Sequence, residues 1–424
     1  MKALDGSARE FDEKQFVQSV IEFKPDVLVV EIPHIVFPLM LPILKEIKST
    51  VNCVIGIAGL FGTAYPERVL TEYDCADFVL IGEWEATLAA IVDSDDPNYD
   101  GIGGVAYKVD RKIIVNNERK LASLAELPFP DRDDLPVGMY RDFEIAGSPV
   151  VQMLATRGCP YRCGFCYITV LYNKPSYRKR DLDDVVDEME LCHDKYKAKQ
   201  IYFDDDTIGV DKGFLRDLAK KIRSRKVDIP WSFMGDITID SKTLEELRKS
   251  GLIGLKFGVE TFNGASLEIA SKRFVNKDKV WDFVATCKKM NIWTHATYQV
   301  GLPGETTESI RRTIQYAKEL DTDSLQISIS TPLPGSPFYE NARINGWLTT
   351  DDLSMYDGSR YAVVSYPSLS ASDIQSLYEE FNSMWEKHLA RRYLKHPISI
   401  HKRASAIGYR PSMRDIIRVV RKSI

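Results

Sequence analysis

The sequence lacks any long apolar segment and contains little cysteine. Its longest apolar run, residues 35–44, has ten residues including two prolines, whereas a membrane-spanning helix needs about 18 or more. Seven cysteines in 424 residues are an odd number, and the N-terminus has no pattern of a secretory signal, so disulfide stapling is not expected. These absences predict a cytoplasmic protein that does not contact a membrane.

Neither sign of charge dominates the chain. Lysine and arginine number 56 and aspartate and glutamate 61, a net charge of −5, which argues against a general nucleic-acid binder. Residues 401–424 are the exception, with seven basic residues and one acid, so this tail carries +6 and the remaining chain −11. A predicted amphipathic helix at 411–421 either binds an acidic macromolecular substrate or forms a solvated face.

The first 120 residues alternate short β-branched runs with helical patterns. We predict strands at 26–32, 53–58 and 77–81, helices at 38–49, 67–73 and 83–92, and a hairpin at 103–115. This alternation is typical of an open parallel sheet, a Rossmann-like α/β domain. A Pro- and Asp-rich stretch follows and predicts a linker at 121–148.

From residue 149 the alternation restarts with longer helices. Strands are expected at 150–155, 200–204, 231–235, 254–259, 294–300 and 324–330, with helices between them. Six strand–helix units predict a partial (β/α)6 barrel over 149–345, with the chemistry at the carboxyl ends of the strands. Residues 346–424 are expected to form a small, partly helical C-terminal appendage.

Three cysteines lie on one loop directly after the first barrel strand. Cys159, Cys163 and Cys166 have the spacing C-x3-C-x2-C, and three thiolates can hold a four-iron cluster while one iron stays open to a further ligand. Structural zinc is the alternative, but zinc usually takes four protein ligands. The next candidates, Cys192 and His193, fall inside a predicted helix.

This loop resembles the signature of the radical S-adenosylmethionine enzymes. Further segments resemble that family's strand ends, and segments of the first domain resemble the cobalamin-binding domain of its cobalamin-dependent members. The barrel segments are 201–207, 258–261, 301–305 and 331–335, and the first-domain segments are 59–63, 66–70 and 81–85. The resemblance therefore implies three cofactors: a [4Fe-4S] cluster, S-adenosylmethionine and cobalamin.

The first domain departs from the family pattern in two ways. Residues 2–6 resemble the second strand of the cobalamin domain, so the opening strand and helix are expected to be missing and one sheet edge to need a cover, from the linker, the appendage or a second subunit. The sequence also contains no Asp-x-His-x-x-Gly motif. A bound cobalamin is then expected to lack the usual histidine ligand.

The resemblance assigns roles to several residues around S-adenosylmethionine. The three loop cysteines would bind the cluster, and the residues expected at the cofactor are Phe165, Asp204, Asp205, Glu260, Gly301 and Gly304. Each has a plainer alternative: loop packing for Phe165, a solvated turn for the aspartates, an ion pair for Glu260 and a simple turn for the glycines. Arg178 and Arg180 either pair with the cofactor carboxylate or are surface charges.

In the first domain, the resemblance places cobalamin at the carboxyl ends of the strands. The residues expected there are His34, Gly59, Gly62, Thr63, Gly82 and Glu83. His34 ends a strand where this family faces the corrin ring, so it either lies beneath cobalt or has a structural role. No catalytic side chain is assigned.

The function implied by the resemblance is a cobalamin-dependent radical S-adenosylmethionine methyltransferase that methylates an unactivated carbon. A protein or peptide residue is the expected substrate, with a glutamine of methyl-coenzyme M reductase as the candidate. A ferredoxin or flavodoxin would supply electrons under anaerobic conditions. Two alternatives stay open: a radical cyclase or rearrangement enzyme with a vestigial cobalamin domain, and an iron–sulfur electron carrier or sensor.

Overall fold

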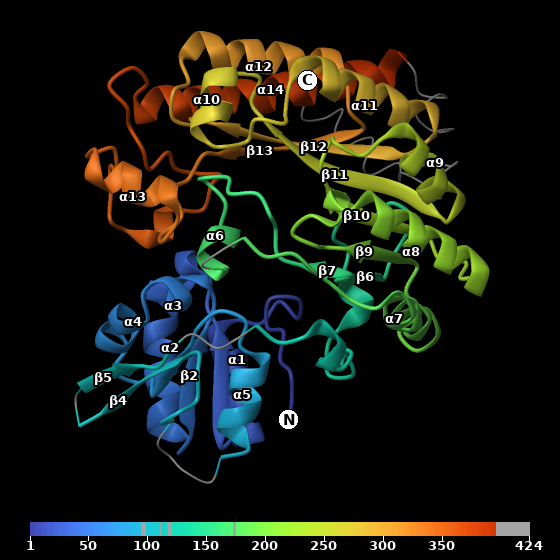
Figure 1. The fold of residues 1–424 in the computed structure, drawn as a ribbon. Coiled ribbons are helices and arrows are strands. Elements are labelled where there is room, and N and C mark those ends of the chain that lie inside the picture. Colours follow the sequence, from blue (N-terminus) through green and yellow to red (C-terminus); the bar gives the residue numbers. More distant parts are fainter. Residues whose placement is uncertain (95–98, 111, 118–120, 173–174, 396–424) are drawn as a thin grey trace. The chain divides into compact units, whose positions relative to one another are not determined.

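The computed structural model describes residues 1–94, 99–110, 112–117, 121–172 and 175–395 (Figure 1). The predicted helix at 411–421 and the basic tail lie outside the described residues. The chain forms two compact units, the first from residues 1–128, 164–175 and 331–364 and the second from 129–163, 176–330 and 365 onward. The sequence suggested consecutive domains, but each unit combines segments from separate parts of the chain.

The first unit contains a five-stranded sheet in the order β1-β2-β3-β4-β5. β1 (Val27–Glu31), β2 (Val54–Ala58) and β3 (Phe78–Leu80) are parallel, and β4 (Val105–Val109) and β5 (Lys112–Val115) add an antiparallel hairpin. The strands fall where the apolar runs predict them, because parallel strands are covered on both faces. This is the expected Rossmann-like sheet.

Helices follow each parallel strand of this unit, and shorter segments from later in the chain join them. The helices are α1 (Glu13–Phe23), α2 (Phe37–Thr50), α3 (Leu60–Ala64), α4 (Pro66–Glu72), α5 (Glu85–Val92), α6 (Ile168–Leu171) and α13 (Pro337–Ile344). Asp12 begins α1 with a capping box, its side chain accepting from the backbone of Gln15. α6 packs against α3.

β1 is an edge strand of this sheet. Among the described residues no strand pairs with its outer side, and its four apolar side chains are only partly buried. The expectation of a second strand at residues 2–6 is wrong: this segment leads into a turn in which Asp5 accepts from the backbone N–H of Ala8. The turn follows from Asp5-Gly6, a pair that favours turns over strands.

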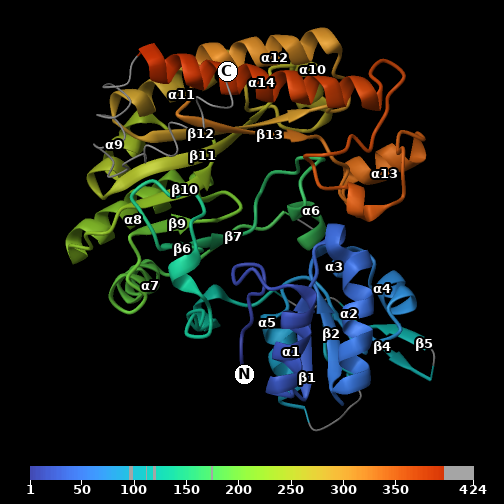
Figure 2. The same cartoon turned by 180° about the vertical axis from the view of Figure 1, so that it is seen from behind.

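The second unit contains a six-stranded, all-parallel sheet in the order β6-β9-β10-β11-β12-β13 (Figures 1 and 2). The strands are β6 (Val150–Met153), β9 (Gln200–Phe203), β10 (Trp231–Gly235), β11 (Leu252–Glu260), β12 (Trp293–Val300) and β13 (Ser324–Ile329). Every one of them overlaps a predicted strand. The partial barrel is thereby confirmed, with strand order following chain order.

Helices connect these strands, and one later helix covers the last of them. They are α7 (Leu182–Asp194), α8 (Lys212–Arg225), α9 (Ser241–Lys249), α10 (Gly264–Ile269), α11 (Lys277–Lys289), α12 (Thr307–Leu320) and α14 (Ala371–Lys395). Side-chain N-caps begin most of them, including Asp181, Asp211 and Asp240. α14 packs against α12 and β13, so the helical part of the expected appendage completes the second unit.

A small ribbon lies between β6 and α7. β7 (Thr156–Arg157) and β8 (Arg178–Lys179) pair antiparallel and bracket the segment that carries the three clustered cysteines. None of the helices described is both long and apolar enough to cross a membrane.

Candidate active site

The cysteine loop leaves β7 at Gly158, and its three thiols differ from the other four. All seven cysteines are thiols. Cys159, Cys163 and Cys166 are partly exposed, whereas the remaining four are buried. Burial raises the pKa of Cys192 to about 11, so this thiol is poorly suited to supply a fourth metal ligand. In the described part of the chain, no three metal-ligating side chains form a group that could hold a metal ion.

Gly158 fixes where the loop begins. Its φ of +90° is unfavourable for other residues, and a side chain there would collide with the backbone of Ser176. Its N–H donates to Asp206 Oδ2 at 2.7 Å. Asp206, the last of the three adjacent aspartates, is therefore hydrogen-bonded to Gly158, the residue at which the cysteine loop begins.

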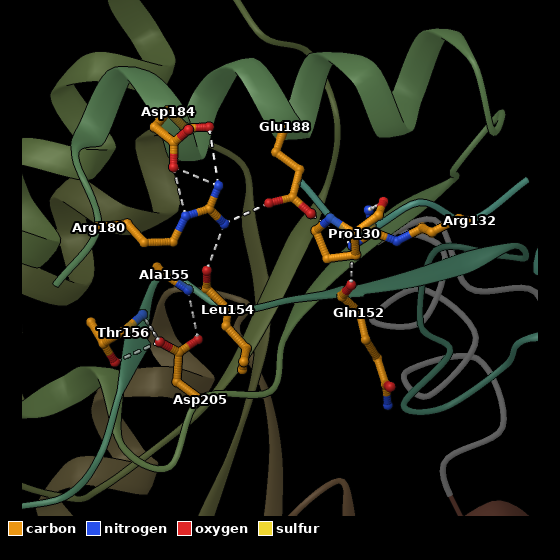
Figure 3. Close-up of polar contacts among 10 residues, drawn as sticks. All are labelled: Pro130, Arg132, Gln152, Leu154, Ala155, Thr156, Arg180, Asp184, Glu188 and Asp205. Carbon is orange, nitrogen blue, oxygen red and sulfur yellow. Dashed lines mark hydrogen bonds and ion pairs between the residues drawn. The ribbon is translucent and has the colours of Figure 1, made fainter. Parts of the chain in front are cut away.

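Asp205 holds the segment just before this loop. Its carboxylate accepts hydrogen bonds from the backbone N–H of Thr156, from the Thr156 hydroxyl at 2.6 Å and from the Ala155 N–H at 3.3 Å (Figure 3). Burial raises the pKa of Asp205 to about 7 despite these donors. Asp204 and Asp206, by contrast, are both exposed.

A buried Arg–Glu–Arg triad supports the same segment from behind. Glu188 of α7 pairs with Arg132 at 2.7 Å and with Arg180 at 2.5 Å, and Arg180 also donates to the carbonyl of Leu154 at 2.8 Å (Figure 3). Arg180 is therefore neither a surface charge nor available for a cofactor carboxylate. Arg132 and Glu188 were not predicted as site residues, because nothing local marks charged residues 56 positions apart as partners.

Glu260 ends β11 in a strained conformation. Its φ is +64°, and the register with β12 shifts between Gly258 and Glu260, which marks a bulge. The carboxylate pairs with Lys272 at 2.5 Å and accepts from Gln299 Nε2 at 3.0 Å. The ion pair considered as its alternative role is thus present.

The Gly301–Glu305 turn follows β12 and is closed by its own glutamate. Glu305 accepts from the backbone N–H groups of Gly301 and Leu302, both at 2.9 Å, and from the Thr261 hydroxyl at 2.7 Å. Burial raises the pKa of Glu305 to about 7. Gly301 and Gly304 have φ of +93° and +84°, so the turn requires both glycines. Glu305 ends the segment 301–305 that resembles the family's strand end, but no separate role was predicted for it.

In the first unit, Thr63 ties together the ends of β2 and β3. Its hydroxyl donates to the carbonyl of Gly59 and accepts from the N–H of Gly82, both at 3.0 Å. Gly62 lies close to Val79, since a side chain there would come within 3.0 Å of it. Glu83 accepts from the Tyr172 hydroxyl at 2.7 Å. These expected cobalamin residues do meet at the carboxyl ends of β2 and β3.

His34 follows β1, and both of its ring nitrogens are engaged. Nε2 lies 3.1 Å from the carbonyl oxygen of Tyr356, which can only accept, so Nε2 carries the proton. Nδ1 then accepts from the Tyr167 hydroxyl at 3.0 Å. Burial lowers the pKa of His34, which keeps the ring neutral. Phe165, just before the third cysteine, is half-buried.

Comparison with known proteins identifies the class of enzyme. The Radical SAM superfamily model matches residues 153–317, from β6 into α12. The fold and the cysteine loop therefore define a radical S-adenosylmethionine enzyme, a class that uses a [4Fe-4S] cluster and S-adenosylmethionine.

Relatives give the particular family. An uncharacterized methyltransferase of Pyrococcus horikoshii is 30% identical over 363 residues, 84% of this chain and 78% of the relative. The chain belongs to the family of that protein. A cytidylyl-2-hydroxyethylphosphonate methyltransferase of Streptomyces wedmorensis is 23% identical, covering 81% of this chain and 71% of the relative. An anaerobic magnesium-protoporphyrin IX monomethyl ester cyclase of Rubrivivax gelatinosus is 25% identical, covering 85% and 65%.

Two solved structures share the fold. The cobalamin-dependent S-adenosylmethionine radical enzyme OxsB, with aqua-cobalamin and S-adenosylmethionine bound, matches with a TM-score of 0.72 at 14% identity, over 98% of this chain and 64% of that one. The radical methyltransferase TsrM of Kitasatospora setae, with cobalamin and a [4Fe-4S] cluster bound, matches with a TM-score of 0.67 at 19% identity, over 89% and 75%. The Rossmann-like and half-barrel sheets are common to all three.

Proposed function

We propose that the chain is a cobalamin-dependent radical S-adenosylmethionine methyltransferase that methylates an unactivated carbon. The observation that carries the proposal is the cysteine loop at the carboxyl end of the first strand of a six-stranded parallel sheet. When bound, the cluster and S-adenosylmethionine supply a hydrogen-abstracting radical, and cobalamin supplies the methyl group.

Cys159, Cys163 and Cys166 would hold the cluster, because they are the accessible thiols and follow one another on a single loop. The rigid start of this loop supports the assignment: Gly158, Asp205 and Arg180 fix the backbone before the first ligand. A well-fixed loop start lowers the cost of ordering the thiolates around the cluster.

S-adenosylmethionine would lie along the carboxyl ends of the barrel strands. Asp204 is an exposed carboxylate there, Glu260 is held by Lys272 and Gln299, and the Gly301–Gly304 turn allows close approach of the backbone. Phe165 would pack beside the cofactor from the cysteine loop. Asp205 would act indirectly. Its oxygens already accept three hydrogen bonds from Ala155 and Thr156, so it would position the start of the cysteine loop and not contact the cofactor.

Cobalamin would be held by the first unit. Gly59, Gly62, Thr63, Gly82 and Glu83 gather at the carboxyl ends of two parallel strands, the edge at which such sheets bind ligands. Gly59 and Gly82 have positive φ and expose no side chain, which suits a cofactor held through backbone contacts. His34 does not suit the role of a cobalt ligand, because both of its ring nitrogens are hydrogen-bonded.

For the substrate we propose a protein or peptide residue, with a glutamine of methyl-coenzyme M reductase as the candidate. The support is the basic tail, whose charge of +6 contrasts with the −11 of the rest and suits an acidic protein surface. Ferredoxin or flavodoxin would deliver the electrons, and the reduced cysteines suit the cytoplasm. Nucleic acid and membrane are not expected partners.

A ring-forming reaction is the second candidate, in which the first unit is vestigial. The Rubrivivax relative named as a cyclase favours it. An electron carrier or sensor is disfavoured, because the family to which the chain belongs is named for methyl transfer and the loop offers only three thiols.

The test is an anaerobic reconstitution of the full chain with iron, sulfide and hydroxocobalamin, followed by desalting and a visible spectrum. Retained corrin bands are expected in the wild type and also in a variant with all three loop cysteines changed to alanine, which should lose only the iron. Absence of corrin from both proteins would favour the cyclase. Methyl transfer is then measured by mass spectrometry with deuteromethyl-labelled S-adenosylmethionine and a glutamine-containing peptide of methyl-coenzyme M reductase. An unlabelled peptide would refute this substrate.

A further inference from the structure

One face of the six-stranded sheet is polar and partly exposed, although parallel sheets are usually buried on both faces. Along β12, buried residues alternate with partly exposed ones. The pairing register places residues of four strands on the same face as the partly exposed set: Gln152 of β6, Lys256 of β11, Thr297 of β12 and Gln326 of β13. This face therefore offers hydrogen-bonding side chains in place of an apolar core.

Part of the predicted linker closes the amino end of this face. Gln200, the first residue of β9, accepts from the backbone N–H groups of Ile145 and Ala146 at 2.9 and 3.0 Å. Gly254 of β11 has no side chain, and a Cβ there would collide with Ile145. The segment 142–146 is therefore a fixed floor at the amino end of the strands.

Lys256 lies on the polar face, close to this floor. Its side chain is only 14% exposed, and Nζ donates to Asp142 Oδ1 at 3.1 Å. Nζ also lies 4.6 Å from the centroid of the Tyr202 ring and 4.9 Å from that of Phe143, and aromatic rings attract cations. An ammonium group has three donors, and the described residues provide an acceptor for one of them. Two donors of Lys256 are left for a ligand.

The neighbour of Lys256 on the next strand has a hydrogen-bonding atom without a partner. His295 of β12 is paired with Lys256 in the strand register, and its Nδ1 lies 2.9 Å from the Ser324 hydroxyl. Its Nε2 is buried and has no hydrogen-bond partner within the described residues. Burial lowers the pKa of His295 to about 4, and Lys256 acts in the same direction, so the ring is neutral. Because buried polar atoms are normally hydrogen-bonded, this atom is a second indication of a polar ligand.

The charges around Lys256 restrict the class of ligand. Asp142 pairs with it, and Asp204, just after β9, adds a second carboxylate: burial raises the pKa of Asp204, Asp142 raises it further and Lys256 lowers it. Two carboxylates beside one ammonium group disfavour a phosphate or carboxylate ligand, since like charges repel. A carboxamide suits these groups, because its oxygen accepts from Lys256 and its NH2 group donates to Asp142.

We propose that Lys256 and Asp142 form a binding site for a neutral carboxamide group of the substrate, on the polar face of the half-barrel sheet. This inference rests on the proposed function and narrows its substrate to one that carries a carboxamide, as glutamine and asparagine side chains do. The site is separate from the residues proposed for S-adenosylmethionine. Lys256 lies in the middle of β11, above the floor at the amino end of the strands.

The test measures peptide binding by equilibrium dialysis on the anaerobically reconstituted full chain. The probes are two blocked tripeptides that differ only in a central glutamine or glutamate. The wild type should bind the glutamine peptide about tenfold more tightly, and Lys256→Met should raise its Kd by about tenfold, the effect of losing a hydrogen bond from a charged donor. Asp142→Asn should lower the Kd of the glutamate peptide and remove the preference. Lys249→Met is the control, because Lys249 is also ion-paired but 53% exposed; both Kd values should match those of the wild type.

The other outcomes count against the site in different ways. An unchanged Kd in Lys256→Met would show that this lysine only stabilises the fold. Tighter binding of the glutamate peptide by the wild type would make the site one for anions and overturn the carboxamide assignment. A wild type that retains iron and corrin but binds neither peptide would overturn the inference and leave cobalamin-dependent methyl transfer in place, whereas loss of corrin would contradict the proposed function itself. If Lys256→Met does not fold, Lys256→Gln replaces it.

Discussion

Removal of Glu188 should destabilise the second unit more than removal of any exposed carboxylate on the same helix. The side chain is 1% exposed and pairs with Arg132 and Arg180. Glu188→Ala leaves two largely buried guanidinium groups without this partner, and breaking a buried pair costs about 3–5 kcal/mol. Arg180 keeps Asp184 at 2.7 Å, so we expect the lower end, about 3 kcal/mol. This is a large fraction of a typical domain stability of about 5–15 kcal/mol.

The control is the preceding residue of α7. Asp187 pairs with Arg225 at 2.8 Å, but its side chain is 50% exposed, so Asp187→Ala should cost no more than about 1 kcal/mol. Both variants are compared with the wild type by urea unfolding of the cluster-free full chain, followed through tryptophan fluorescence. Trp231 is fully buried in β10 and reports on the second unit.

If Glu188→Ala loses no more stability than Asp187→Ala, the triad does not support the start of the cysteine loop as the contacts imply. A variant that replaces all three members, Arg132→Leu with Glu188→Met and Arg180→Met, should recover much of the loss. Apolar replacement of a whole buried ionic group is often neutral or stabilising. This triple variant should still bind less iron than the wild type, because it lacks the hydrogen bond from Arg180 to the carbonyl of Leu154.

Three further predictions concern the cofactors and pH. Alanine at Cys159, Cys163 and Cys166 together should abolish cluster absorbance and bound iron; a triple variant that still assembles a four-iron cluster would refute the ligand assignment. Burial raises the pKa of Asp205 to about 7 from about 3.9 in the unfolded chain. The folded state therefore keeps a proton that the unfolded chain loses, and stability should fall as the pH rises from about 4 to 7. Urea unfolding across this range should show a steeper slope in the wild type than in Asp205→Asn, in which Glu305, whose pKa burial also raises to about 7, still contributes. Paramagnetic resonance of cob(II)alamin bound to the chain should show no protein nitrogen coupling, and a coupling that vanishes in His34→Ala would show that the ring can leave its two hydrogen bonds.

Local sequence determined the elements and the spacing of the three clustered cysteines. The β-branched runs of the strands and the aspartate caps of the helices act within a few residues, so the six parallel barrel strands were predictable. The spacing of the three cysteines likewise needs no tertiary information, because all lie on one loop. Gly301 and Gly304 lie in a turn after a strand, the plainer alternative considered for them, and both have positive φ there.

Only the tertiary structure decided which charged group meets which. Glu188 reaches Arg132 across 56 positions and His34 reaches Tyr356 across 322, and no local pattern encodes such pairs. The acidic turn illustrates the difference: three adjacent aspartates look alike in the sequence, yet alternation at the strand end buries Asp205 and exposes Asp204. Burial and partner set the role of a carboxylate, and both depend on segments that fold together from distant parts of the chain.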